Sequence, residues 1–201
     1  MKKLKVLLTA APGFNLDKFD IYRNQGKGYG LYPPIQLATI SSSVLKEVKN
    51  VDVEILNLEY ELLKHFKENE KSPLSPRDLM KTILIDKMDD FQPDLIGIGV
   101  MFSTTHDNAL AVANIIKKKN PTTQVVCGGN HATFEYKRML EECSSLDFIF
   151  TYEADNTFPL FLEYLKGKIE FNDLKGLAWL DKATNKAKLG PNSPIVKDLD
   201  S

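Results

Sequence analysis

The fold is decided by a short apolar run that follows a turn, Pro93-Asp94-Leu95-Ile96-Gly97-Ile98-Gly99. Its residues are apolar at successive positions, with no polar residue between them, as expected of a strand that is covered on both faces. Strands of this kind are typical of parallel sheets, in which helices connect one strand to the next. The run therefore predicts a buried strand over residues 95–101.

Similar runs occur on both sides of this stretch. They predict four further strands, over residues 4–10, 51–58, 125–127 and 148–151. Between the strands, apolar residues recur at three- and four-residue spacing, which is typical of helices with one buried face. These helices are expected to begin near Pro34, Pro76, Thr104, Phe134 and Phe158.

Two of the helix starts have the spacing of a capping box, Ser75 with Asp78 and Thr104 with Asp107. Residues 59–75 are charged and show no clear period, so we expect them to be irregular.

Five strands that alternate with helices predict an α/β fold with a doubly wound, five-stranded parallel sheet. Right-handed crossovers leave few topologies, and we expect the flavodoxin-like order. Ligands of such sheets bind outside the carboxyl ends of the strands. The loops at that edge are residues 10–34, 58–60, 101–106, 127–133 and 151–156.

The last part of the chain departs from this alternation. Residues 174–180 and 186–189 flank a polar turn and predict a β-hairpin. Residues 190–201 contain two prolines and are typical of an extended linker. We therefore expect a domain over residues 1–170, followed by a hairpin and linker over residues 171–201.

Composition excludes several classes of protein. The chain has 201 residues, with 26 basic and 27 acidic side chains, and the net charge of −1 gives no field that would attract nucleic acid. No apolar run approaches the roughly 18 residues of a membrane span, and no signal peptide opens the chain. The two cysteines, Cys127 and Cys143, form no disulfide framework and suit a reducing compartment. These features predict a cytoplasmic globular protein.

Candidate ligand-binding residues follow the third and fourth strands. Gly128 and Gly129 let a ligand approach the backbone closely, although a tight turn into the next helix also explains them. The hydroxyls of Ser103, Thr104 and Thr105 are placed to hydrogen-bond a ligand, and capping of the next helix by Thr104 is the alternative.

Other candidates are less specific. Among three histidines, His131 is best placed for a ligand, with a structural role as the alternative. Glu153 follows the fifth strand, where it accepts hydrogen bonds from a ligand or favours the start of a helix. The glycine-rich residues 26–30 suggest a flexible flap over a ligand.

Several common catalytic motifs are absent from the sequence. There is no G-x-G-x-x-G after the first strand, no P-loop, no G-x-S-x-G and no histidine pair at metal-ligand spacing. The chain therefore offers loops that form a pocket, but no catalytic residue and no metal site.

The ordered segments together resemble the N-terminal cobalamin-binding domain of radical S-adenosylmethionine enzymes. The resemblance is carried by segments 32–38, 93–99, 126–133 and 147–149. Segment 152–158 resembles the family's Gly-Glu-Gly-Glu-x-Thr-Phe, with Tyr152, Ala154 and Asp155 as departures. Among the subgroups, the chain looks most like the anaerobic magnesium-protoporphyrin IX monomethyl ester cyclase type, which acts in tetrapyrrole biosynthesis.

The resemblance implies that cobalamin lies over the carboxyl ends of the strands, with its nucleotide tail in the crevice of the sheet. Its implied contacts are Ser103, Thr104, Thr105, Gly128, Gly129 and Glu153. Pro12, Gly13 and His131, in the loops at the same edge, are further candidates for contact with the cofactor. The family pattern Asp-x-His-x-x-Gly is missing, since residues 10–17 contain no histidine. Cobalamin is therefore expected to bind without a histidine ligand from the protein.

The resemblance also implies a second domain. The 4Fe-4S cluster of these enzymes is held by Cys-x-x-x-Cys-x-x-Cys and binds S-adenosylmethionine, but Cys127 and Cys143 cannot form this motif. We therefore expect the chain to be the N-terminal domain of a longer enzyme, a cyclase, oxidoreductase or methyltransferase acting on a small molecule. Its partner is then the C-terminal radical S-adenosylmethionine domain of the same polypeptide.

Two alternatives stay open from the sequence. A domain of the same fold that has lost cobalamin would serve to dock the substrate or the radical domain. A freestanding flavodoxin-like enzyme is a further alternative, but the missing phosphate-binding loop argues against it.

Overall fold

The structure of the protein is a computed structural model that describes residues 3–19, 33–69 and 72–193. Its helices are α1 (Ile35–Glu47), α2 (Leu58–Glu68), α3 (Pro76–Phe91), α4 (His106–Lys119), α5 (Asn130–Glu142) and α6 (Thr157–Leu165). Its strands are β1 (Leu4–Ala10), β2 (Val51–Leu56), β3 (Leu95–Gly99), β4 (Gln124–Gly128), β5 (Phe148–Phe150), β6 (Leu177–Asp181) and β7 (Lys186–Leu189). Short 3-10 turns cover Ser103–Thr105 and Phe171–Asp173.

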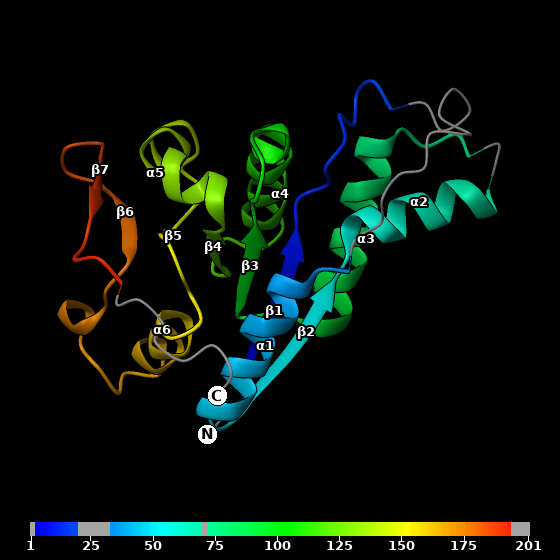
Figure 1. Cartoon of the computed structure of the whole chain (residues 1–201). Coiled ribbons are helices and arrows are strands. Elements are labelled where there is room, and N and C mark those ends of the chain that lie inside the picture. The colour runs from blue at the N-terminus through cyan, green and yellow to red at the C-terminus, as the bar shows by residue number, and fades with distance from the viewer. Residues whose placement is uncertain (1–2, 20–32, 70–71, 194–201) are drawn as a thin grey trace.

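The seven strands within the described residues form one sheet in the order β2-β1-β3-β4-β5-β6-β7 (Figure 1). The strands from β1 to β5 pair in parallel, which confirms the predicted α/β fold and its flavodoxin-like order. The predicted C-terminal hairpin is also present, as β6 and β7. It extends the sheet, because β6 pairs antiparallel with β5.

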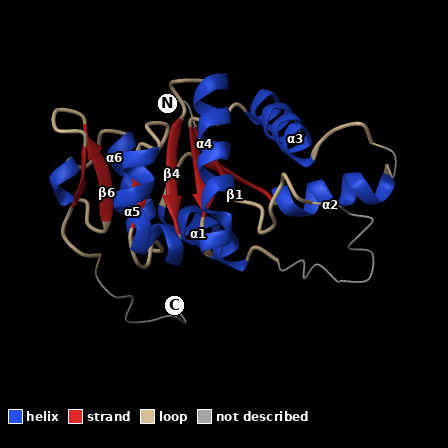
Figure 2. Ribbon diagram, turned by 90° about the horizontal axis from the view of Figure 1, so that it is seen from above, coloured by secondary structure: helices blue, strands red, loops and turns tan. Residues whose placement is uncertain are grey.

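Helices cover both faces of the sheet, and each face has its own core. On one face, α1 and α6 bury residues such as Val44 and Phe161 against the sheet. On the other, α2 to α5 bury a larger cluster that includes Leu62, Leu84 and Ile116. In Figure 2, strands β1 and β4 lie between α4 on one side and α1 on the other.

Helix α2 contradicts the expectation that residues 59–75 are irregular. Leu58, Leu62 and Phe66 are buried and lie four residues apart, so they form one apolar stripe that faces the core. The side chain of Asn57 caps the helix by accepting a hydrogen bond from the backbone N–H of Tyr60. The charged residues between these positions obscured the stripe in the sequence.

The two predicted capping boxes have different outcomes. The Ser75 hydroxyl accepts a hydrogen bond from the backbone N–H of Asp78 and so caps α3. The Asp78 carboxylate accepts from the Ser75 hydroxyl, so only the N-cap half of the first box forms. The second does not form, because residues 103–105 make a 3-10 turn in which Thr105 donates to the carbonyl of Phe102. Helix α4 begins after this turn, without a side-chain cap.

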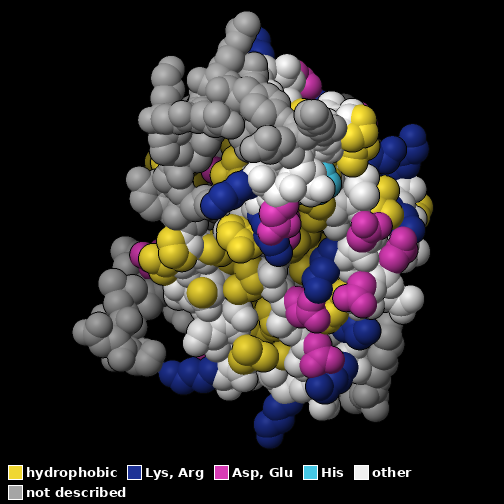
Figure 3. Space-filling model, turned by 90° about the vertical axis from the view of Figure 1, so that its right-hand side faces the viewer, with side chains coloured by type: hydrophobic (Ala, Val, Ile, Leu, Met, Phe, Trp, Pro, Cys, Tyr) yellow, Lys and Arg dark blue, Asp and Glu magenta, His cyan; other side chains and the backbone are white. Residues whose placement is uncertain are grey.

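The β2 edge of the sheet carries charges of both signs, as Figure 3 shows from the side. Glu54 on this strand pairs with Lys87 of α3, and Asp52 pairs with Lys3 at 2.7 Å. Paired charges on an edge strand disfavour its association with another strand. None of the helices within the described ranges is long and apolar enough to cross a membrane.

Candidate functional site

A cavity of about 330 Å³ opens at the carboxyl edge of the sheet, on the face that α1 and α6 cover. Its floor is a row of small residues on three neighbouring strands, because Ala10 pairs with Gly99 and Gly99 pairs with Gly128. Gly97 lies one row deeper, between Leu8 and Val126. The floor thus exposes backbone where other positions of the same face carry side chains.

The missing side chains are what keep the cavity open. A Cβ atom at Gly97 would lie 2.9 Å from Leu8 Cδ2, and one at Gly99 would lie 3.3 Å from Leu37 Cδ2. Gly129 has a φ of +115°, and a Cβ there would lie 2.7 Å from the carbonyl oxygen of Val100. The end of β4 therefore approaches the end of β3 more closely than any other residue type permits.

The walls of the cavity are apolar and its mouth is polar. The apolar part of the lining includes Leu37 and Ile40 of α1, Phe150 of β5 and Phe158 of α6. Polar side chains at the mouth come from α1, the start of α5 and the β5–α6 loop: Gln36, Thr39, Asn130, Glu153 and Asp155. An apolar slot with a polar rim suits an organic ligand that carries a flat apolar part and polar substituents.

Three of the residues predicted from the sequence, Gly128, Gly129 and Glu153, line this cavity. The other six do not, although they lie in loops at the same edge. Of these, Ser103 and Thr104 are exposed, whereas Thr105 is buried and donates its hydroxyl to the carbonyl of Phe102. The flap predicted at residues 26–30 lies outside the described residues.

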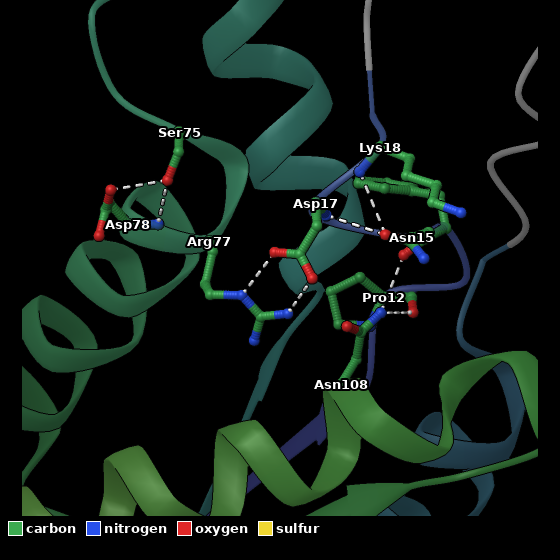
Figure 4. Close-up of polar contacts among 9 residues, drawn as sticks. Pro12, Asn15, Asp17, Lys18, Ser75, Arg77, Asp78 and Asn108 are labelled. Atoms are coloured by element: carbon green, nitrogen blue, oxygen red, sulfur yellow. Dashed lines mark hydrogen bonds and ion pairs between the residues drawn. The ribbon is translucent and has the colours of Figure 1, made fainter.

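Pro12 and Gly13 belong to a loop that turns away from the cavity and packs against α2, α3 and α4 (Figure 4). The buried Asn108 of α4 donates two hydrogen bonds, to the carbonyls of Pro12 at 2.8 Å and Phe14 at 2.9 Å. Gly13 donates its N–H to Glu59 of α2 at 2.8 Å. This part of the loop is thus held by the helices behind the sheet.

The same loop forms a bidentate ion pair with α3. Arg77 of α3 donates to both carboxylate oxygens of Asp17, at 2.9 and 2.8 Å (Figure 4). These hydrogen bonds hold the pKa of the Asp17 carboxyl below its usual range. Both side chains are substantially exposed, so the pair positions the loop and contributes little stability.

His131 also turns away from the cavity. Its Nε2 atom lies 2.8 Å from Nδ1 of His106, and Nε2 of His106 lies 3.1 Å from the carboxylate of Glu142. Burial, followed by the neighbouring His106, lowers the pKa of His131. Hydrogen bonds from Arg138 and then His106 lower the pKa of Glu142. The three side chains form a hydrogen-bonded chain that joins α4 to α5.

Cys127 is among the residues that line the cavity, but both cysteine side chains belong to the core on the opposite face of the sheet. Cys127 of β4 is buried with the core on the opposite face of the sheet, and burial raises its pKa. Cys143, after α5, is also buried, and its pKa is raised for the same reason. Within the described parts of the chain, no group of three or more His, Cys, Asp or Glu side chains is arranged to hold a metal ion.

Sequence reasoning missed several lining residues. The signal for Gly97 and Gly99 was present, since two glycines at alternate positions of an apolar strand leave one face without side chains. Gln36, Thr39 and Ile40 gave no such signal, because their approach to the β5–α6 loop depends on how α1 packs against α6.

Comparisons with known proteins bear on this site. The chain is 30% identical over 126 residues to the cytidylyl-2-hydroxyethylphosphonate methyltransferase of Streptomyces wedmorensis, an alignment that covers 63% of this chain and 22% of that protein. The chain thus spans about a fifth of the length of this curated relative.

Two solved structures share the fold. The radical S-adenosylmethionine methyltransferase TsrM of Kitasatospora setae has a TM-score of 0.69 at 15% identity, over 93% of this chain and 30% of that one. The cobalamin-dependent S-adenosylmethionine radical enzyme OxsB has a TM-score of 0.67 at 18% identity, over 96% and 23% of the two chains.

The family comparison covers most of the parallel sheet. Residues 26–162, from the loop before α1 into α6, match the family described as the B12 binding domain. The matched region includes all of the cavity's lining except Leu8 and Ala10 of β1. This chain belongs to the B12-binding domain family.

Proposed function

We propose that the chain binds cobalamin, with part of the cofactor inserted into the cavity between α1 and α6. The observation that carries this proposal is the floor of Ala10, Gly99 and Gly128, which lie in register across three strands. A ligand that enters a sheet at this depth needs a floor of glycine and alanine, because a larger side chain would occupy its space.

The residues present fit the chemistry of this cofactor. The apolar walls suit the aromatic base of the nucleotide tail, and the polar side chains at the mouth suit its sugar, phosphate and amide groups. We propose that no protein histidine binds the cobalt, because residues 10–17 contain none and His131 is hydrogen-bonded to His106. Cobalamin, when bound, supplies a cobalt ion that carries a methyl group or accepts electrons.

The parent protein is proposed to be a radical S-adenosylmethionine enzyme, with this chain as its N-terminal module. Its 4Fe-4S cluster and S-adenosylmethionine site then lie in a separate domain, outside residues 1–201. Methyl transfer to a small molecule is the favoured reaction, because the curated relative at 30% identity is named a methyltransferase. The cyclase-like assignment and the cytoplasmic location stay predictions from the sequence.

The test is uptake of hydroxocobalamin. The purified chain is incubated with the cofactor, desalted and examined by visible absorption spectroscopy, with bovine serum albumin as the control for carry-over. We expect a coloured protein with a stoichiometry near one and a shifted cobalamin spectrum. A folded but colourless protein would overturn the proposal and would favour the alternative of a docking domain that has lost the cofactor.

A further inference from the structure

Tyr152, at the mouth of the cavity, has a backbone conformation that aromatic residues rarely adopt. Its φ is +62°, in the left-handed region. The other non-glycine residues with positive φ in the described ranges are Asn50, Gln92 and Asn185. Asparagine tolerates this region better than other residues, whereas a tyrosine there is strained. The side chain of Tyr152 is nevertheless 59% exposed, so packing within the protein does not explain its presence.

The loop around Tyr152 is held by hydrogen bonds from both sides. The N–H of Thr151 donates to the carbonyl of Gly176 at 2.8 Å, and the N–H of Tyr152 donates to Thr133 Oγ1 at 2.9 Å. The hydroxyl of Ser193 donates to the carbonyl of Glu153 at 3.2 Å.

The hydroxyl of Ser43 in α1 donates to the carbonyl of Asp155 at 2.7 Å. Four segments that are distant in the sequence thus fix four of the five residues from 151 to 155. Strained conformations persist where the surrounding structure determines them in this way, and they cluster at ligand-binding sites.

We propose that Tyr152 contacts the bound cofactor, and that the loop holds it in the strained conformation so that its ring packs against cobalamin at the cavity's mouth. A tyrosine ring provides a large, rigid and largely apolar contact surface with only two side-chain torsions to fix. Tyr152 lines the cavity together with Glu153, Ala154 and Asp155 of the same loop. This inference rests on the proposed cobalamin binding.

The test distinguishes the contribution of the Tyr152 ring to cobalamin affinity from the effect of the backbone strain on stability. In Tyr152→Gly the strain is relieved and the ring is lost, so we expect the Tm to rise by about 2 °C or more while the Kd for hydroxocobalamin rises about tenfold. Tyr152→Asn also lacks the ring but keeps a less flexible backbone, and its Kd should rise similarly. Tyr152→Phe keeps the ring, and its Kd should stay within about twofold of the wild-type value.

Gln92→Gly is the matched control, because Gln92 has a φ of +52° at the end of α3, just before β3 begins at the opposite edge of the sheet. It should raise the Tm without changing the Kd. Equal cobalamin affinity of the wild type and Tyr152→Gly would overturn the inference, as would a loss in Tyr152→Phe as large as that in Tyr152→Gly. A wild-type protein that takes up no cobalamin would contradict the proposed function instead.

Discussion

A Cβ atom at Gly128 would point into the cavity and would meet only the Cβ of Phe150, at an ordinary contact distance of 3.6 Å. Gly128→Ala should therefore fold with a Tm close to that of the wild type, because the methyl group clashes with nothing in the protein. It should weaken cobalamin binding, because the methyl group occupies space above the floor. Thermal unfolding and a visible-absorption titration measure the two effects; unchanged affinity would place the cofactor elsewhere.

Substitution of Gly129, the next residue, should destabilise the fold, unlike substitution of Gly128. Its φ of +115° and the 2.7 Å separation of a Cβ from the Val100 carbonyl oxygen leave no room for a side chain. Gly129→Ala is expected to lower the free energy of unfolding by about 1–3 kcal/mol or more. Urea unfolding of Gly128→Ala and Gly129→Ala side by side checks this; equal stability would show that the β4–α5 turn relaxes freely.

At the scale of elements, the helices behind the sheet hold the loop after β1, and the two anchors should differ in strength. Asn108→Ala leaves the carbonyls of Pro12 and Phe14 without their donor in a buried environment, at a cost of about 1–3 kcal/mol. Arg77→Ala removes an exposed ion pair, at a cost of about 0–1 kcal/mol. Urea unfolding of both variants measures the order, and a larger loss for Arg77→Ala would contradict it.

The contact between His106 of α4 and His131 of α5 predicts that the thermal stability depends on pH. The pKa of His131 is lowered in the folded protein, so the unfolded chain, with a pKa of about 6.5, binds the proton more readily. Neutral His131 therefore favours the folded state, and this contribution to stability is complete above the pKa of the unfolded chain. It is lost as the pH falls through the pKa of His131 in the folded protein. The Tm should therefore decrease as the pH is lowered from about 7 towards 5.

His131→Gln should flatten the pH dependence of the Tm in this range. The carboxylates of Asp17 and Glu142 also have lowered pKa values, but they titrate below about pH 4.5 and should leave the range unaffected. His65→Gln, in α2, is the control for loss of a histidine outside the pair. An identical profile for the wild type and His131→Gln would contradict the prediction.

Sequence reasoning recovered the elements whose pattern is local. The apolar runs of β1 and β3 and the cap of α3 at Ser75 are each encoded within a few residues. It failed for α2, whose apolar stripe of three residues is diluted by charges. The meeting of His106 with His131, 25 residues apart, depends on how α4 packs beside α5, and no local pattern reports it.

At the scale of the molecule, the hairpin is continuous with the sheet and its cores. Leu177 and Ala178 of β6 are 2% and 0% exposed, and each belongs to one of the two cores. The sequence placed the end of the main domain at residue 170 from the change of pattern alone. That boundary stays a prediction, and the structure suggests a way to test it.

Truncation to residues 1–170 would expose the edge of β5 and remove the buried side chains of β6. We expect this chain to lose on the order of 3 kcal/mol or more of stability, or to aggregate. Thermal unfolding and size-exclusion chromatography of residues 1–170 and 1–193 compare the two. Equal Tm values would show that the hairpin is an appendage to an independent domain.

The burial of both cysteines has a practical consequence for studying this protein. Alkylating and disulfide reagents react with the thiolate, and both thiols are shielded and have raised pKa values. A single cysteine introduced at an exposed position of the cavity's mouth, such as Asn130, would then be the fastest to react with a fluorescent maleimide. Because the native thiols are expected not to react, the chain can be labelled at a chosen site without first replacing them.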